Sequence, residues 1–232
     1  MSDAPPAQTA EQGLKGSVTV LEPDRLERTV ARRSAETRAT VPTMEFTTVV
    51  DMDAAMEREA ELGCGVVALL IRATAHALDT VRRVNASYRD GHYELYSRVN
   101  VGVTIVEQGI YVTPTIFDAD EKTELEIANE LAGYYVRARE GELRSAELTG
   151  ATFTVVDSSA YDIVALTPMI ISPQAGALAA GPIRDVPVIR HGEVVAGRMM
   201  QLALSVDHRI VYGHHAAAFL EEVKAHLEEA RA

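Results

Sequence analysis

The segment Ser205-Val206-Asp207-His208-Arg209-Ile210-Val211-Tyr212-Gly213 decides how this chain is interpreted. An apolar stretch from Met200 to Val206 precedes it and predicts a strand, and the small residues after Gly213 predict a helix. His208 therefore sits at a strand-to-helix junction, between an acidic and a basic residue. Histidine titrates near neutral pH, so it can accept and return a proton under physiological conditions. Taken alone, the segment fits a general base at the end of a strand, and it also fits a histidine that merely ends that strand.

Working outward from this junction, the rest of the chain mixes helical and strand patterns without strict alternation. Strands are expected at 43–51, 99–106, 110–116, 152–156, 176–181, 186–190 and 194–206, with a hairpin over 88–96. Helices are expected at 24–37, 54–62, 66–81, 121–140 and 213–230. This pattern predicts an α/β fold in which helices cover an open mixed β-sheet, as one domain over residues 17–232 after a flexible tail at 1–16.

Two local signals define helix ends. Asp24 and Glu27 form a capping box at the start of the first helix, and Asp53 is expected to cap the second. Gly63 is expected to end that second helix. The Gly63-Cys64-Gly65 sequence imitates a dinucleotide-binding loop, but such a loop follows a strand, and this one follows a predicted helix.

Composition excludes several classes of partner. The formal net charge is −12 with no basic block, so nucleic acid and anionic membranes are poor partners. Only three of the 22 basic residues are lysine, and arginine suits phosphorylated ligands, although a codon bias accounts for the same count. The single cysteine, Cys64, forms no internal disulfide and no cysteine-based metal site. Adjacent His214 and His215 point about 100° apart on a helix, so no metal site is predicted. A cytoplasmic location is expected.

Several blocks, in order and with consistent spacing, carry a family resemblance. They are Val30-Ala31-Arg32-Arg33, Ala39-Thr40-Val41-Pro42, Asn85-Ala86-Ser87-Tyr88, Asn100-Val101-Gly102-Val103, Asp118-Ala119-Asp120, Arg139-Glu140-Gly141-Glu142-Leu143, Thr152-Phe153-Thr154, Pro173-Gln174 and the His208 segment. Together they resemble the catalytic core domain of the dihydrolipoamide acyltransferases of 2-oxo acid dehydrogenase complexes. The likeness covers the chain from about Leu21 to its C-terminus.

This resemblance implies a fold, a reaction and an assembly. The fold would be a chloramphenicol-acetyltransferase-like two-layer sandwich that forms homotrimers with active sites between subunits. The reaction would move an acyl group between a dihydrolipoyl thiol and coenzyme A, both of them substrates, with the lipoyl group carried by another protein. By the resemblance, His208 is the catalytic base, Asp207 and Arg209 support it, and Gly213 begins the helix where a side chain cannot fit.

Two positions depart from the family pattern. The family has an aspartate four residues after the histidine, where this chain has Tyr212. The family's oxyanion-donating serine falls on Val156, and a shift of the backbone would present Ser158 instead. Two alternatives to this reaction therefore stay open. One is that the chain is a catalytically degraded homologue that serves as a structural trimer or assembly subunit. The other is that it transfers acyl groups to a small-molecule acceptor.

The C-terminal sequence bears on assembly. Larger members of the family join trimers through an apolar C-terminal tail. Here the last residues are mostly charged, with Leu227 as the only large apolar side chain. Burying charged side chains without partners costs more than one leucine returns. The sequence therefore predicts a closed trimer.

Overall fold

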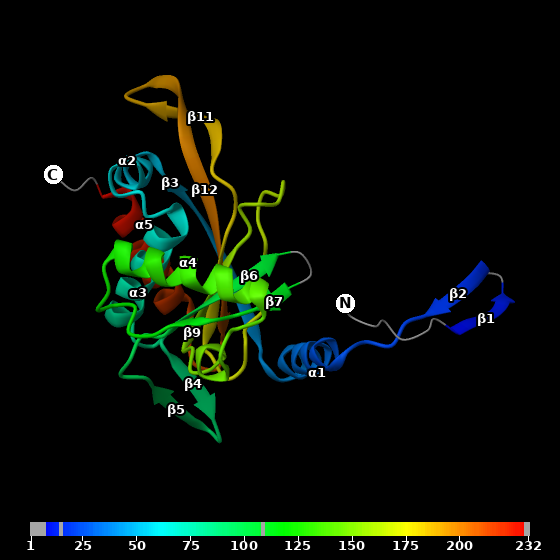
Figure 1. The fold of residues 1–232 in the computed structure, drawn as a ribbon. Coiled ribbons are helices and arrows are strands. Elements are labelled where there is room, and N and C mark those ends of the chain that lie inside the picture. Colours follow the sequence, from blue (N-terminus) through cyan, green and yellow to red (C-terminus); the bar gives the residue numbers. More distant parts are fainter. Residues whose placement is uncertain (1–7, 14–15, 108–109, 230–232) are drawn as a thin grey trace. The chain divides into compact units, whose positions relative to one another are not determined.

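The computed structural model describes residues 8–13, 16–107 and 110–229 (Figure 1). Within it the chain divides into two compact units, residues 1–40 and 41–232. Each unit is described by itself.

The first unit holds a hairpin and a helix. Strands β1 (Gln8–Gly13) and β2 (Gly16–Val20) pair antiparallel, and α1 (Arg25–Thr40) follows. The predicted capping box is confirmed, because the Asp24 amide donates to the Glu27 carboxylate at 2.7 Å and the Glu27 amide donates to Asp24 at 2.8 Å. Strand β1 lies in the segment for which the sequence predicted a tail. The boundary at residue 16 stays a prediction.

A mixed sheet forms the centre of the second unit. Its strands, listed across the sheet, are β3 (Thr43–Asp51), β12 (Glu193–Asp207), β10 (Gly176–Ala180), β9 (Phe153–Asp157) and β6 (Val101–Glu107). Strands β7 (Ile110–Val112) and β8 (Thr115–Ile116) pair with β6, and β11 (Arg184–Arg190) pairs with β12. β6, β9 and β10 run parallel to one another, whereas β12 runs antiparallel to β10 and to β3. The predicted mixed sheet is confirmed.

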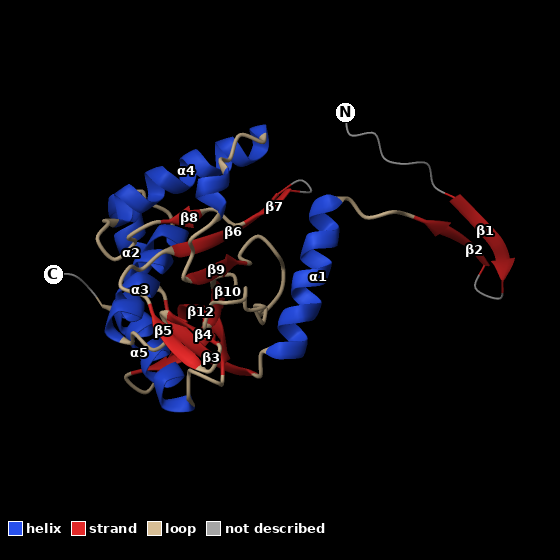
Figure 2. Ribbon diagram, turned by 90° about the horizontal axis from the view of Figure 1, so that it is seen from below, coloured by secondary structure: helices blue, strands red, loops and turns tan. Residues whose placement is uncertain are grey.

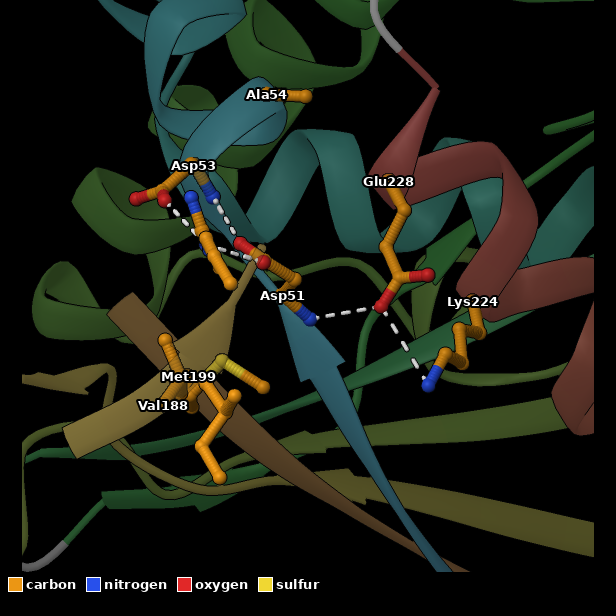
Figure 3. A pocket seen from close by; sticks show the side chains of 9 residues that line it. Asp51, Asp53, Ala54, Val188, Met199, Lys224 and Glu228 are labelled. Carbon is orange, nitrogen blue, oxygen red and sulfur yellow. Dashed lines mark hydrogen bonds and ion pairs between the residues drawn. The ribbon is translucent and has the colours of Figure 1, made fainter. Parts of the chain in front are cut away.

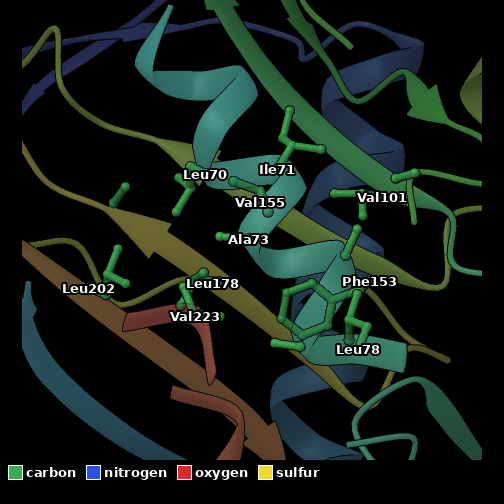
Figure 4. Close-up of a cluster of buried hydrophobic side chains, with 14 of the residues drawn as sticks. Leu70, Ile71, Ala73, Leu78, Val101, Phe153, Val155, Leu178, Leu202 and Val223 are labelled. Atoms are coloured by element: carbon green, nitrogen blue, oxygen red, sulfur yellow. The ribbon is translucent and has the colours of Figure 1, made fainter. Parts of the chain in front are cut away.

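The helices α2 (Asp53–Leu62), α3 (Val66–Thr80), α4 (Glu124–Glu140) and α5 (Gly213–Glu228) lie on one face of this sheet (Figures 1 and 2). Alternation along β9 explains which side chains meet them. Phe153 and Val155 are completely buried in the cluster under α3 and α5 (Figure 4). The centroids of the Phe153 ring and the Phe219 ring of α5 lie 5.4 Å apart. Burying each such side chain contributes about 1.5–3 kcal/mol to the stability of the fold. Strands β4 (Ala86–Arg89) and β5 (His92–Leu95) pair antiparallel in a short hairpin that follows α3 in the chain.

Two local expectations were wrong. The strand expected over 110–116 is divided into β7 and β8 around Pro114, which has no amide hydrogen to donate to a neighbouring strand. Asp53 does not cap α2, because Met52 is the N-cap residue and the Asp53 carboxylate bonds Arg190 and Arg198 instead. The predicted end of α2 is confirmed, since Gly63 adopts the left-handed conformation there with φ of 63°.

Within the described part of the chain, no single helix is long and apolar enough to cross a bilayer; α2 and α3 pass that test only as a pair, bent by 115°.

Candidate active site

Backbone hydrogen bonds shape the junction that follows β12. The His208 amide donates to the carbonyl of Pro42 at 2.9 Å. The amides of Ile210 and Val211 both donate to the Asp207 carbonyl, at 3.1 and 2.9 Å. These bonds turn the chain back on itself before α5 begins. The turn fixes the backbone from which the His208 side chain projects.

Asp207 and Arg209 form a pair beneath this turn. The Asp207 side chain is only 2% exposed, and its carboxylate accepts the Arg209 amide at 3.0 Å and the guanidinium at 3.0 and 2.6 Å. These hydrogen bonds raise the pKa of Arg209. The guanidinium also lies 4.6 Å from the centre of the Tyr88 ring. Since Asp207 is buried and fully engaged, the geometry suits a support for the turn.

His208 is exposed, and among the described residues its ring makes one hydrogen bond. Nδ1 lies 3.2 Å from the Val211 carbonyl oxygen. A carbonyl oxygen only accepts, so the bond assigns the hydrogen of the neutral ring to Nδ1. The lone pair is then on Nε2. Nε2 is the atom of His208 that can accept a proton.

Tyr212 and Gly213 form the start of α5. Tyr212 is the N-cap residue, is 40% exposed, and places its ring at 90° to the His208 ring with centroids 5.7 Å apart. Gly213 is the first residue of α5, as predicted. The crowding expected there is not found, because a Cβ on Gly213 would meet no atom within 4 Å.

Two residues near the junction were not predicted from the sequence. The Nε of Arg83 donates to the Ile210 carbonyl at 3.0 Å, and its guanidinium lies 4.2 Å from the centre of the Tyr93 ring. The neighbouring Tyr212 hydroxyl raises the pKa of Tyr93. The Asp90-Gly91 signal correctly predicted the hairpin that carries Tyr93. Nothing in the sequence placed that hairpin beside the junction.

The end of β9 holds Val156, one of the two positions that depart from the family pattern, and Ser158, the alternative donor. Val156 is partly buried between Thr104 of β6 and Ala179 of β10, and it has no group to donate. Ser158 is completely buried, and both its amide and its hydroxyl donate to the Ala180 carbonyl, at 2.9 and 2.7 Å. In this conformation the hydroxyl hydrogen of Ser158 is already used. Its assignment as oxyanion donor stays a prediction.

One chain does not bring these two regions together. Val156 lies opposite Ala179, which lies opposite Ala203, five residues before His208 along β12. At about 3.3 Å per residue this is a separation of about 17 Å. Because β9 and β12 run in opposite directions, their C-terminal ends lie at opposite edges of the sheet.

A pocket of about 490 Å³ lies at the other end of β12 (Figure 3). Its lining includes Asp51, Asp53, Lys224 and Glu228 together with apolar side chains such as Met199. The carboxylates of Asp51 and Asp53 are paired with arginines, and Glu228 accepts the Asp51 amide. Met199 lies eight residues before Asp207, so this pocket is remote from His208. It does not belong to the candidate active site.

Cys64 and the acidic side chains supply no second centre in the described residues. Cys64 is buried, and burial raises the pKa of its thiol, which keeps the thiolate scarce at neutral pH. No group of three histidine, cysteine or acidic side chains is placed to hold a metal ion within residues 8–13, 16–107 and 110–229.

The described chain is thus an α/β structure in which helices cover one face of a mixed sheet, with an exposed histidine just past the end of β12. The chain belongs to the family described as 2-oxoacid dehydrogenases acyltransferase (catalytic domain), whose sequence model matches residues 15–232.

Relatives and solved structures agree with this assignment. The chain is 32% identical over 216 residues to the dihydrolipoyllysine-residue succinyltransferase component of the 2-oxoglutarate dehydrogenase complex from Bartonella vinsonii subsp. berkhoffii, covering 88% of this chain and 52% of that protein. The chain thus spans about half the length of the curated relatives it matches. A probable dihydrolipoamide acetyltransferase from Listeria monocytogenes superimposes with a TM-score of 0.86 at 27% identity, over 91% of this chain and 94% of that one.

A chloramphenicol acetyltransferase superimposes with a TM-score of 0.54 at 18% identity, over 84% of this chain and 94% of that one, and shows the fold alone. The fold class predicted from the sequence is confirmed.

Proposed function

We propose that this chain transfers an acyl group between a dihydrolipoyl thiol and coenzyme A. The observation that carries the proposal is the His208 ring, whose bond from Nδ1 to the Val211 carbonyl leaves the Nε2 lone pair available. Family membership supplies the reaction class. Coenzyme A and the dihydrolipoyl group act as substrates.

His208 has two tasks in this reaction. Nε2 takes the proton of the attacking thiol as its sulfur bonds to the thioester carbonyl carbon. When the carbon–sulfur bond of the original thioester breaks, the departing thiolate takes the proton back from Nε2. The acyl group has then changed carriers, and His208 has returned to its starting state. Asp207 and Arg209 hold the turn during both steps.

The negative oxygen formed between these steps needs a hydrogen-bond donor. Val156 supplies none. For Ser158 to donate, its hydroxyl has to exchange the Ala180 carbonyl for the substrate. The β9 end is therefore the weaker half of the proposed site.

A homotrimer is part of this proposal. The His208 junction and the β9 end lie at opposite edges of the sheet in one chain, so a site containing both requires a second copy. Leu227 is completely buried within its own chain, so this side chain does not join one trimer to another. A cytoplasmic location stays a prediction.

The proposal is tested by turnover and by size. Purified protein should transfer acyl groups from at least one of acetyl-, succinyl- and branched-chain acyl-coenzyme A to dihydrolipoamide, and light scattering should give the mass of three chains. A trimer without turnover would favour the second candidate, a structural assembly subunit, for which Val156 is the specific observation. A monomer, or a particle of 24 or 60 chains, would contradict the assembly.

A further inference from the structure

We propose that Tyr212 is a positioning residue that holds the His208 imidazole with Nε2 directed toward the reacting thiol. The inference rests on the proposed function, because it concerns the same base. It treats Tyr212 as a replacement for the aspartate of the family pattern, with a different way of supporting the histidine. If Tyr212 instead reflected a loss of catalytic activity, Tyr212→Asp would raise kcat for acyl transfer.

Few contacts orient the His208 ring. The ring is exposed, and the one hydrogen bond that it makes among the described residues, to the Val211 carbonyl, is 3.2 Å long. Tyr212 supplies a second restraint, with ring centroids 5.7 Å apart at 90°. Aromatic rings prefer this perpendicular arrangement within about 4.5–7 Å. The contact resists rotation of the His208 ring away from Val211.

Tyr212 itself lies beside the β4–β5 hairpin. Its hydroxyl is close enough to raise the pKa of Tyr93, and Arg83 covers the Tyr93 ring at 4.2 Å. Arg83 also donates to the Ile210 carbonyl, within the turn that carries His208. The hairpin and the turn are therefore tied together through Arg83.

A second histidine also contacts Tyr212. The His215 ring stacks on the Tyr212 ring with centroids 5.8 Å apart and a 29° interplanar angle, and His215 Nδ1 accepts the Tyr212 amide at 3.2 Å. A nitrogen that accepts carries no hydrogen, so His215 is neutral in this contact. Burial, the neighbouring His214 and Arg83 lower the pKa of His215, which agrees with that state. Tyr212 thus contacts two imidazoles.

An aspartate at position 212 would make none of the ring contacts. It has no ring to place against His208 or His215, and it is too short to reach as far toward Tyr93 as the tyrosine hydroxyl does. Tyr212→Asp should therefore lower kcat, even though it restores the residue of the family pattern. The loss should be about three- to tenfold, the size expected for an aromatic pair, with the KM for dihydrolipoamide changed less than kcat. Tyr212→Leu, which keeps apolar bulk without a ring, should behave in the same way.

The conservative changes separate the ring from the hydroxyl. Tyr212→Phe keeps the ring beside His208 and should retain most of kcat. Tyr93→Phe should also retain most of kcat, because it leaves the Tyr212 ring in place. Tyr111→Phe is the control, since Tyr111 is 47% exposed on β7 and lies outside this cluster. Far-ultraviolet circular dichroism checks that each variant folds.

The decisive readout does not depend on turnover. The nitrogen shifts of the ¹⁵N-labelled His208 ring, assigned with His208→Gln, should show the Nδ1–H tautomer in the wild type and in Tyr212→Phe. They should show a mixture of tautomers in Tyr212→Asp and Tyr212→Leu. A wild type that transfers no acyl group but shows this pattern would reject the proposed function and keep the positioning role. Unchanged tautomers in Tyr212→Asp and Tyr212→Leu, or a kcat raised by Tyr212→Asp, would overturn it.

Discussion

The ends of β12 and β9 are built in different ways. Past β12, the His208 turn is anchored by a pair in which Asp207 is 2% exposed. Past β9, the loop is held by an ion pair between Arg184 and Asp162, whose side chain is 96% exposed. Buried charge pairs resist disruption, whereas exposed pairs contribute about 0–1 kcal/mol. The turn that carries His208 is therefore held by a buried ion pair, and the loop beyond Ser158 by an exposed one.

The ends of β12 and β9 also differ in the chemical groups that they offer to a substrate. At the β12 end a histidine, its carbonyl partner and its supporting pair form a complete general-base arrangement. At the β9 end Val156 has no donor and Ser158 is turned to Ala180. In the proposed site, the group for proton transfer is therefore present, and the expected side-chain donor at position 156 is missing.

The largest effect should come from removing the base. His208→Ala should lower kcat by about 10²–10⁴-fold, the usual contribution of a general base. Steady-state transfer to dihydrolipoamide measures it. His191→Asn is the matched control, because His191 lies in the β11–β12 turn with φ of 52°, which asparagine tolerates. Equal rates for His208→Ala and the wild type would remove His208 from the mechanism.

The next effect should be a gain at the β9 end. If Val156 occupies the place of the oxyanion donor, Val156→Ser should raise kcat, by at most about 10²–10³-fold. Val156→Thr is a useful companion, since it adds a hydroxyl to the same branched shape. An unchanged or lower kcat in both would show that the missing donor is not at position 156.

The smallest effect concerns stability. Arg209→Met leaves the Asp207 carboxylate buried without its guanidinium partner, and should lower the free energy of unfolding by about 1–3 kcal/mol. Arg184→Met, at the exposed pair, should change it by less than about 0.5 kcal/mol. Urea denaturation of both variants compares them directly. A larger loss for Arg184→Met would reverse the contrast between the two ends.

Much of the fold follows from local sequence. The alternating β-branched residues of Thr43–Asp51 predicted β3 with its observed limits, and Gly63 ended α2 as expected. Asp53 was misread because its partners, Arg190 and Arg198, are more than 130 residues away. Local capping preference lost to a tertiary ion pair there.

The candidate site was predicted in part. The junction and His208 were readable because an apolar strand, a titratable residue and a small-residue helix follow one another directly. The role of the Val211 carbonyl depends on the shape of the turn, and the contacts of Arg83 and Tyr93 depend on how the β4–β5 hairpin packs. Neither follows from spacing along the chain. The opposite placement of Val156 and His208 needed the strand directions, which the pattern alone does not give.

The central claim is that the two halves meet only between chains, and a mixing experiment tests it most directly. His208→Ala/Val156→Ser carries the serine without the base, and the wild type carries the base without the serine. Co-refolded trimers of the two should exceed the summed activity of the separate proteins, because a serine from one chain then faces His208 of another. Activity equal to that sum, with Val156→Ser itself more active than the wild type, would show that both halves act within one chain and contradict the account.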